Sequence, residues 1–176
     1  MAYFPGGALA AVIDGLGHGP KAAAAAHAAA AVLRMRPDET VTDLMAMCHI
    51  ALRQTRGAVI SLASFDAATA SVTWLGVGNV AGVLLRRAPM TLPAREGLTS
   101  RGGVVGFRMP PLRATCLSVR RGDLLVLATD GIKADFNQGL SIDRSIDEIA
   151  AGILHEHGRT TDDALVLVVL CSGMPP

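Results

Sequence analysis

Three apolar segments of this 176-residue chain each have an aspartate at one end. The segments are residues 8–13, 124–129 and 164–170. Asp14 follows the first, Asp130 follows the second, and the pair Asp162-Asp163 comes directly before the third. Short apolar runs bounded by turn residues are typical of buried strands. Three buried strands that carry carboxylates at their ends are the outline of a metal site.

The energetics of such a cluster indicate which ions it would hold. Two carboxylates ~4 Å apart repel each other by roughly 4 kcal/mol at an effective dielectric near 20, so a fold would gather several of them only around divalent cations. No Cys/His cluster accompanies these acids, and hard oxygen ligands favour Mg²⁺ or Mn²⁺ over zinc. Taken one at a time, each acid also has a structural explanation. Asp14 and Asp130 could cap a following turn or helix, and Asp162-Asp163 could be a solvated turn.

Composition narrows the class of protein. Half of the residues are apolar (51%), which suits one globular domain with a sizeable core. A formal net charge of +1 and an aromatic content of 3% argue against a nucleic-acid-binding protein. The apolar stretch 22–33 is shorter than the ~20 residues that a membrane span needs, and no secretory leader precedes it. The dispersed cysteines Cys48, Cys116 and Cys171 indicate reduced core thiols in a cytoplasmic protein.

The first third of the chain predicts a strand followed by two helices. Proline at the first helical position and a run of alanines predict a helix over residues 20–36. Asp38 or Thr40 can cap a second helix, and Gly57 is expected to end it.

The rest of the chain predicts mainly strands. Three β-rich runs are expected to form an antiparallel meander, followed by two further strands joined by a turn at 120–122. The meander runs are 58–65, 71–77 and 80–85, and the two later strands are 113–119 and 123–129. The Pro-, Gly- and Arg-rich segment 86–111 is either a functional loop that contacts a partner or an ordinary connection. An amphipathic helix over 147–157, with Ile149, Ile153 and Leu154 facing inward, precedes the last strand. This order of elements predicts an α+β fold in layers.

The glycine turn after the first strand has a rival interpretation. A strand, then Gly15, Gly17 and Gly19, then a helix is similar to a dinucleotide-binding loop. Two details weigh against that interpretation. The third glycine comes one residue early, and Asp14 places a negative charge where a pyrophosphate would lie. His18, between two glycines, is expected to be exposed near the site, with a core histidine as the alternative.

Five motifs in order resemble the metal-dependent serine phosphatases of the PPM family (protein phosphatase 2C-like), with the RsbX/SpoIIE type as the closest bacterial branch. The motifs are Asp14-Gly-Leu-Gly-His-Gly19, Gly76-Val-Gly-Asn79, Arg101-Gly-Gly-Val-Val-Gly106, the segment from Gly122 to Gly131, and Asp162-Asp163. The resemblance covers nearly the whole chain. It implies a single PPM-type domain over residues 1–176, folded as an α-β-β-α sandwich of two antiparallel sheets flanked by helices.

The resemblance also assigns roles to the site residues. Asp14 is similar to the carboxylate that bridges two cations, Mn²⁺ or Mg²⁺, and Gly15 to the residue that offers its backbone carbonyl. Asp130 and Asp162 are similar to the remaining ligands, with Asp163 orienting its neighbour or serving as an alternative ligand. The implied reaction is hydrolysis of phosphoserine or phosphothreonine by metal-activated water. His18 is the candidate general acid for the leaving oxygen.

By resemblance, the substrate is a phosphorylated bacterial regulator, either an anti-sigma antagonist or a stressosome subunit. The sequence does not indicate an oligomeric state. One departure matters, because the family's first strand usually carries a Gly-Asp pair and this chain has no acid before Asp14. Either the sequence is a truncated form that lacks the family's first strand, or the second cation is held more weakly. The alternative function is a catalytically weak binding module with an incomplete metal site.

Overall fold

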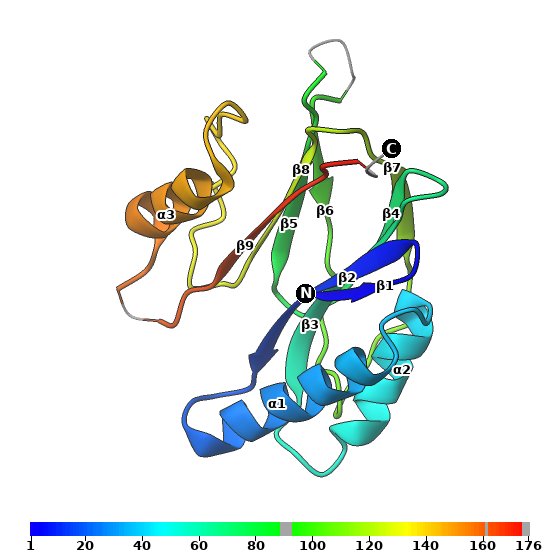
Figure 1. Ribbon diagram of the computed structural model, residues 1–176. Helices are drawn as coiled ribbons and strands as arrows, with labels where there is room; N and C mark the ends of the chain where they lie inside the picture. The colour runs from blue at the N-terminus through cyan, green and yellow to red at the C-terminus, as the bar shows by residue number, and fades with distance from the viewer. Residues whose placement is uncertain (89–92, 161, 174–176) are drawn as a thin grey trace. The chain divides into compact units, whose positions relative to one another are not determined.

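The computed structural model describes residues 1–88, 93–160 and 162–173 (Figure 1). The chain forms two compact units, and each unit contains one sheet. Unit 1 consists of Met1–Asn79 and Ser100–Ser118, and unit 2 of Val80–Thr99 and Val119–Pro176. Every residue of unit 1 is described, whereas the undescribed residues 89–92, 161 and 174–176 belong to unit 2.

Unit 1 contains an antiparallel five-stranded sheet with the order β1-β2-β3-β4-β7. Its strands are β1 (Ala2–Phe4), β2 (Gly7–Gly15), β3 (Ala58–Asp66), β4 (Ser71–Val77) and β7 (Thr115–Ser118). In the register, Gly15 lies opposite Ala58, and Ile60 lies opposite Val77. The end of β2, the start of β3 and the end of β4 therefore share one end of the sheet. We call it the Asp14 end.

Two helices cover one face of this sheet. Helix α1 (Pro20–Met35) has Pro20 in its first turn and packs through small alanines, and α2 (Val41–Ala51) packs beside it (Figure 1). The Thr40 hydroxyl caps α2 by accepting a hydrogen bond from the Asp43 N–H at 3.1 Å, as predicted. The predicted end of α2 at Gly57 is wrong. The helix ends at Ala51, and a turn in which the Thr55 hydroxyl donates to the Leu52 carbonyl leads to Gly57.

Unit 2 contains an antiparallel sheet with the order β6-β5-β8-β9 in its described residues. The strands are β5 (Ala81–Leu85), β6 (Arg95–Leu98), β8 (Leu124–Ala128) and β9 (Val166–Leu170). Helix α3 (Ile146–His157) packs on this sheet through Ile149 and Ile153. Ser145 and Glu148 form a capping box at its start, and Gly158 follows its end as predicted. Leu154, expected to face inward, is 41% exposed.

The predicted pairing of the third meander strand is wrong. The third run of the expected meander, β5, pairs with β6 and β8 rather than with β4. The strand β7 pairs with β4, so the 120–122 turn does not join two paired strands. In both cases the chain passes from one unit to the other, at residues 79–80 and 118–119. Local turn residues indicate where a strand ends, but they do not specify which sheet takes the next strand. The segment 86–111, predicted as a loop, includes β6, and its residues 89–92 lie outside the described residues.

The two units bury polar groups of different kinds. In unit 1, the Trp74 Nε1–H donates to the fully buried Ser61 hydroxyl at 2.8 Å. In unit 2, the Arg86 guanidinium donates to the Asp123 carboxylate at 3.2 Å and to Glu96 at 3.0 Å. Asp123, 1% exposed, also accepts backbone N–H bonds, which is how a buried charge is kept solvated by protein groups.

The cysteines only partly follow the prediction of core thiols. Cys48 is buried, and burial raises the pKa of its thiol to about 12, so it stays protonated at neutral pH. Burial raises the pKa of the half-buried Cys171 to about 11. Cys116 is exposed on β7, contrary to expectation. All three thiols are free.

No helix in the described part of the chain is long and apolar enough to cross a lipid bilayer.

Candidate functional site

The Asp14 turn lies at the end of β2 in unit 1. Asp14 is still within the strand, opposite Val59, and is half-buried. Leu16 then donates its N–H to the Gly57 carbonyl at 3.0 Å, which fastens the turn to the start of β3. Gly17 and Gly19 have φ angles of +83° and +78°, which favour glycine, and the chain enters α1 directly afterwards. The predicted order of strand, glycine turn and helix is confirmed.

Gly15 is required for a different reason. A Cβ at this position would lie 2.1 Å from the Ala22 carbonyl oxygen in the first turns of α1. The backbone of β2 and the backbone of the helix are therefore in direct contact at Gly15. This contact fixes Asp14, its neighbour, relative to the start of the helix.

His18 is exposed between the two glycines, as expected from the sequence. Its role as a general acid stays a prediction. His49, to which the sequence suggested no role, accepts a hydrogen bond from the Gly106 N–H on its Nδ1 at 2.9 Å and so positions the segment between β6 and β7.

The second set of predicted ligands lies in unit 2. Thr129, which precedes Asp130, makes two hydrogen bonds to Leu165, through its N–H at 3.1 Å and its hydroxyl oxygen at 3.0 Å. A Cβ on Gly131 would lie 2.1 Å from the Asp163 carbonyl oxygen. The Asp130-Gly131 step therefore packs directly against the segment that carries Asp162 and Asp163. The residues after Asp130 form turns, so the helix that Asp130 could have capped is not present there.

Asp162 and Asp163 are both exposed, and they are linked to each other. The Asp163 N–H donates to the Asp162 Oδ1 at 2.9 Å. This bond restrains the Asp162 carboxylate, and it is the main chain of Asp163 that does so. The resemblance had given Asp163 the role of orienting its neighbour or of an alternative ligand, and that role stays a prediction.

The structure thus places the predicted site residues in two sets. Unit 1 holds Asp14, Gly15 and His18, and unit 2 holds Asp130 with the Asp162-Asp163 pair. Within either unit, the described residues include no group of three or more His, Cys, Asp or Glu side chains arranged to hold a metal ion. The atoms that the two sets offer are carboxylate and carbonyl oxygens, and this chemistry fits Mg²⁺ or Mn²⁺. Their assignment as ligands stays a prediction.

One residue that the sequence did not single out lies against the Asp14 turn. An Arg56 guanidinium nitrogen is 2.7 Å from the point that a Cβ on Gly17 would occupy. Arg56 follows α2 in the chain, so only the tertiary structure brings it to this turn.

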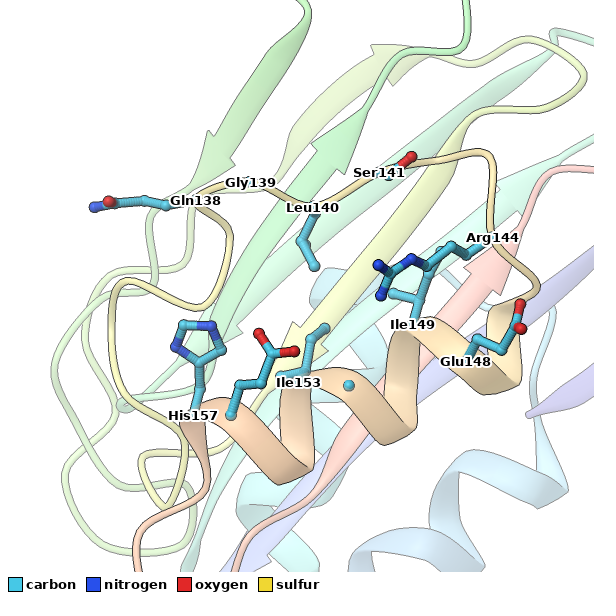
Figure 2. Close-up of a pocket in the computed structure, with 11 residues that line it drawn as sticks. Gln138, Gly139, Leu140, Ser141, Arg144, Glu148, Ile149, Ile153 and His157 are labelled. Atoms are coloured by element: carbon cyan, nitrogen blue, oxygen red, sulfur yellow. The ribbon is translucent and has the colours of Figure 1, made fainter.

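A hollow of about 120 Å³ lies elsewhere in unit 2, between α3 and the loop 138–144 (Figure 2). Figure 2 shows Leu140 of the loop above Ile153 of the helix, with Arg144 and Glu148 toward one end and His157 at the other. None of the predicted ligands lines it. The carboxylate of Glu148, whose pKa is lowered by hydrogen bonds from Ser145, is engaged in the helix cap.

Comparison with solved structures identifies the fold. A chain from work on the bacterial stressosome, as a system adapted to control secondary messenger signalling, has a TM-score of 0.79 and 28% identity, over 93% of this chain and 84% of that one. RsbX in complex with magnesium has a TM-score of 0.79 and 23% identity, and the match covers 91% of this chain and 78% of that one. The PP2C phosphatase domain of SpoIIE from Bacillus subtilis has a TM-score of 0.70 and 19% identity, and the match covers 92% of this chain and 54% of that one. The predicted fold class, two antiparallel sheets with helices, is confirmed.

A protein-family model supplies the assignment. The model described as Stage II sporulation protein E (SpoIIE) matches residues 5–171, which is nearly the whole chain. None of the curated proteins compared with the chain matches it significantly. The match to the family model confirms the resemblance to the SpoIIE type, and the chain belongs to the SpoIIE family.

Proposed function

We propose that this chain removes phosphate from phosphoserine or phosphothreonine of a bacterial regulatory protein, with two divalent cations as cofactors. In the proposal one PPM-type domain spans residues 1–176. Asp14, the Gly15 carbonyl, Asp130 and Asp162 would hold the cations. The observation that carries the proposal is the pair of Asp-Gly steps, each held by a backbone contact at the end of a buried strand.

The reaction follows from the chemistry of the substrate. Water supplies the oxygen that bonds to phosphorus, the bond between phosphorus and the serine or threonine oxygen breaks, and that oxygen takes up a proton. Divalent cations, when bound, neutralise charge on the phosphoryl oxygens and make water a better nucleophile. No side-chain nucleophile is required, which agrees with the raised pKa of the Cys48 and Cys171 thiols.

The protein's own residues position the reacting groups. Backbone contacts at Gly15 and Gly131 fix the main chain next to Asp14 and Asp130, so both carboxylates start from a set position. The Asp163 N–H engages one oxygen of Asp162 and leaves the other for a cation. His18 is exposed on the same turn as Asp14, and in this proposal it donates the proton that the leaving oxygen takes up.

The regulatory partner is proposed from the relatives. A similar structure comes from work on the stressosome, and another contains the RsbU and RsbW domains of a Mycobacterium tuberculosis protein. We therefore expect the substrate to be a phosphorylated stressosome subunit or anti-sigma antagonist.

The test is turnover of a phosphoserine peptide with and without Mn²⁺. Asp14→Asn and Asp130→Asn should each lower kcat at least ~100-fold, since a misplaced or missing cation removes charge stabilisation from the transition state. Asp38→Asn, which removes an exposed carboxylate between the two helices of unit 1, is the matched control and should keep the wild-type rate. Wild-type rates in both site variants would refute the metal mechanism.

Calorimetric titration with Mn²⁺ separates the proposal from its alternative. Two binding sites support the enzyme with two cations. One site or none would indicate a binding module with an incomplete metal site.

A further inference from the structure

The charges of unit 1 are separated along its sheet. Unit 1 contains five acidic residues, and four of them lie away from the Asp14 end. These four are Asp38, Glu39 and Asp43 in and around the connection from α1 to α2, and Asp66 at the opposite end of β3. Asp14 is therefore the one acid of this fully described unit at the Asp14 end.

Five basic residues lie at the Asp14 end, where Asp14 is the one acid of unit 1. Lys21 is in the first turn of α1, and Arg53 and Arg56 follow α2, which returns to the Asp14 end. Arg101 pairs with Val77 at the end of β4, where its N–H donates to the Gly76 carbonyl at 3.1 Å. Arg108 belongs to the next turn of the chain. All five of these side chains are exposed.

An exposed aromatic ring lies in the same place. The turn 104–108 is closed by two backbone hydrogen bonds between Val104 and Arg108, at 2.8 and 2.9 Å, and it presents Phe107 with 83% exposure. The turn is anchored at the start of β3. Val105 is buried and pairs with Ala58, and a Cβ on Gly57 would lie 2.6 Å from the Val104 Cγ1. The turn that carries Phe107 therefore lies against Gly57, the residue that follows Arg56 in the chain.

Arginines around a rigid exposed aromatic are the composition of a protein interface. Aromatic residues and arginine are enriched at the energetically dominant positions of interfaces, and charged rims select partners of opposite sign. A site for a small molecule would enclose its aromatic residues, whereas Phe107 projects into solvent. The positive charge excludes a basic partner and favours a segment rich in Asp, Glu or phosphate.

We propose that the Asp14 end of unit 1 is a docking surface for an acidic segment of the phosphoprotein substrate. Phe107 is its apolar anchor, and Arg56, Arg101 and Arg108 are its cationic contacts. This inference rests on the proposed function, because the docked segment is the one that carries the phosphoserine toward Asp14. It adds a substrate class, namely phosphoserine flanked by acidic residues.

Binding of labelled phosphopeptides to the full chain in EDTA, followed by fluorescence anisotropy, tests the surface without turnover. One peptide carries Asp and Glu around the phosphoserine, and its partner carries Ser and Ala instead. The acidic peptide should bind at least ~10-fold more tightly at low salt, and the difference should shrink above about 0.5 M salt. Arg56→Gln and Arg108→Gln should each weaken binding of the acidic peptide up to about fivefold, as expected for exposed charge pairs. Phe107→Ala should weaken it by ~10-fold or more.

Two variants are matched controls. Arg34→Gln removes an exposed arginine near the far end of α1, and Tyr3→Ala removes another exposed aromatic, on β1. Both should bind the acidic peptide as the wild type does. Melting curves establish that all variants are folded.

Several outcomes would overturn the docking surface. These are equal affinity for the two peptides, binding by the Arg56 and Phe107 variants equal to that of the controls, or tighter binding of a single-stranded oligonucleotide than of the acidic peptide. Hydrolysis of p-nitrophenyl phosphate with Mn²⁺ reports on the proposed function separately. If that hydrolysis is absent while the peptide preference persists, the phosphatase proposal fails and the docking surface stands.

Discussion

Unit 1 and unit 2 each contain an Asp-Gly step at the end of a buried strand, and the two glycines meet the same steric demand. A Cβ on Gly15 would lie 2.1 Å from the Ala22 carbonyl oxygen, and a Cβ on Gly131 would lie 2.1 Å from the Asp163 carbonyl oxygen. Neither glycine has a positive φ. Both are therefore required for close approach of two backbone segments and not for an unusual backbone conformation.

The two steps differ in the origin of the opposing backbone. Ala22 belongs to the helix that follows Gly15 directly, so the position of Asp14 depends on local structure. Asp163 comes from a distant part of the sequence, and β9 and the Thr129–Leu165 hydrogen bonds bring it to Gly131. Local contacts re-form easily after a perturbation, whereas the unit 2 arrangement depends on the whole sheet. The comparison teaches that the same Asp-Gly motif, with the same steric demand, can depend on local structure in one unit and on long-range structure in the other.

The largest effect is expected from a methyl group at either glycine. Gly15→Ala and Gly131→Ala should each lower the free energy of unfolding by about 3 kcal/mol, because a backbone carbonyl cannot move aside as a flexible side chain can. Urea denaturation measures the change. Gly97→Ala on β6, where a Cβ meets nothing within 4 Å, is the control and should cost far less. If Gly131→Ala leaves the free energy of unfolding unchanged, the two glycines do not meet the same steric demand.

Cation binding tests whether the Asp14-Gly15 and Asp130-Gly131 steps hold the same cations. At a Mn²⁺ concentration of about 100 times Kd, the wild type should gain roughly 2.7 kcal/mol of stability. Asp14→Asn and Asp130→Asn should both lose most of this gain, and Asp38→Asn should retain it. Thermal melts with and without Mn²⁺ give the values. Loss in one variant alone would assign the cations to a single unit.

The link that is specific to unit 2 should have a smaller effect. Thr129→Ala removes the hydroxyl that accepts the Leu165 N–H and should cost about 1 kcal/mol, the net value of one hydrogen bond. Thr129→Ser keeps the hydroxyl and should cost less. Chemical denaturation distinguishes them, and an equal loss in both variants would point to the methyl group instead.

The smallest change is expected at a glycine without a packing role. Gly152 lies inside α3, and a Cβ there meets nothing within 4 Å. Gly152→Ala should raise stability by about 0.5–1 kcal/mol through helix propensity. A loss of stability in denaturant would show that the open space beside this glycine is needed.

The sequence was sufficient for features with a local cause. The strand before Asp14, the start of α1 at Pro20 and the Thr40 cap follow from neighbouring residues, and all three are confirmed. The sheet assignments of β5 and β7 were missed, because strand partners are chosen by long-range packing. Arg56 was missed for the same reason. It is unremarkable in the sequence, and only the fold brings it to Gly17.

The passages of the chain between the units have a consequence for synthesis on the ribosome. Unit 1 is completed only by residues 100–118, after the chain has contributed residues 80–99 to unit 2. The edge strand β7 and the turn with Phe107 are therefore synthesised after most of unit 1. Until then β4 has no strand paired to its outer edge, and most of unit 2 has not yet been synthesised. A nascent chain stopped after Asn79 would present an open sheet edge, which is the kind of surface that chaperones and aggregation compete for.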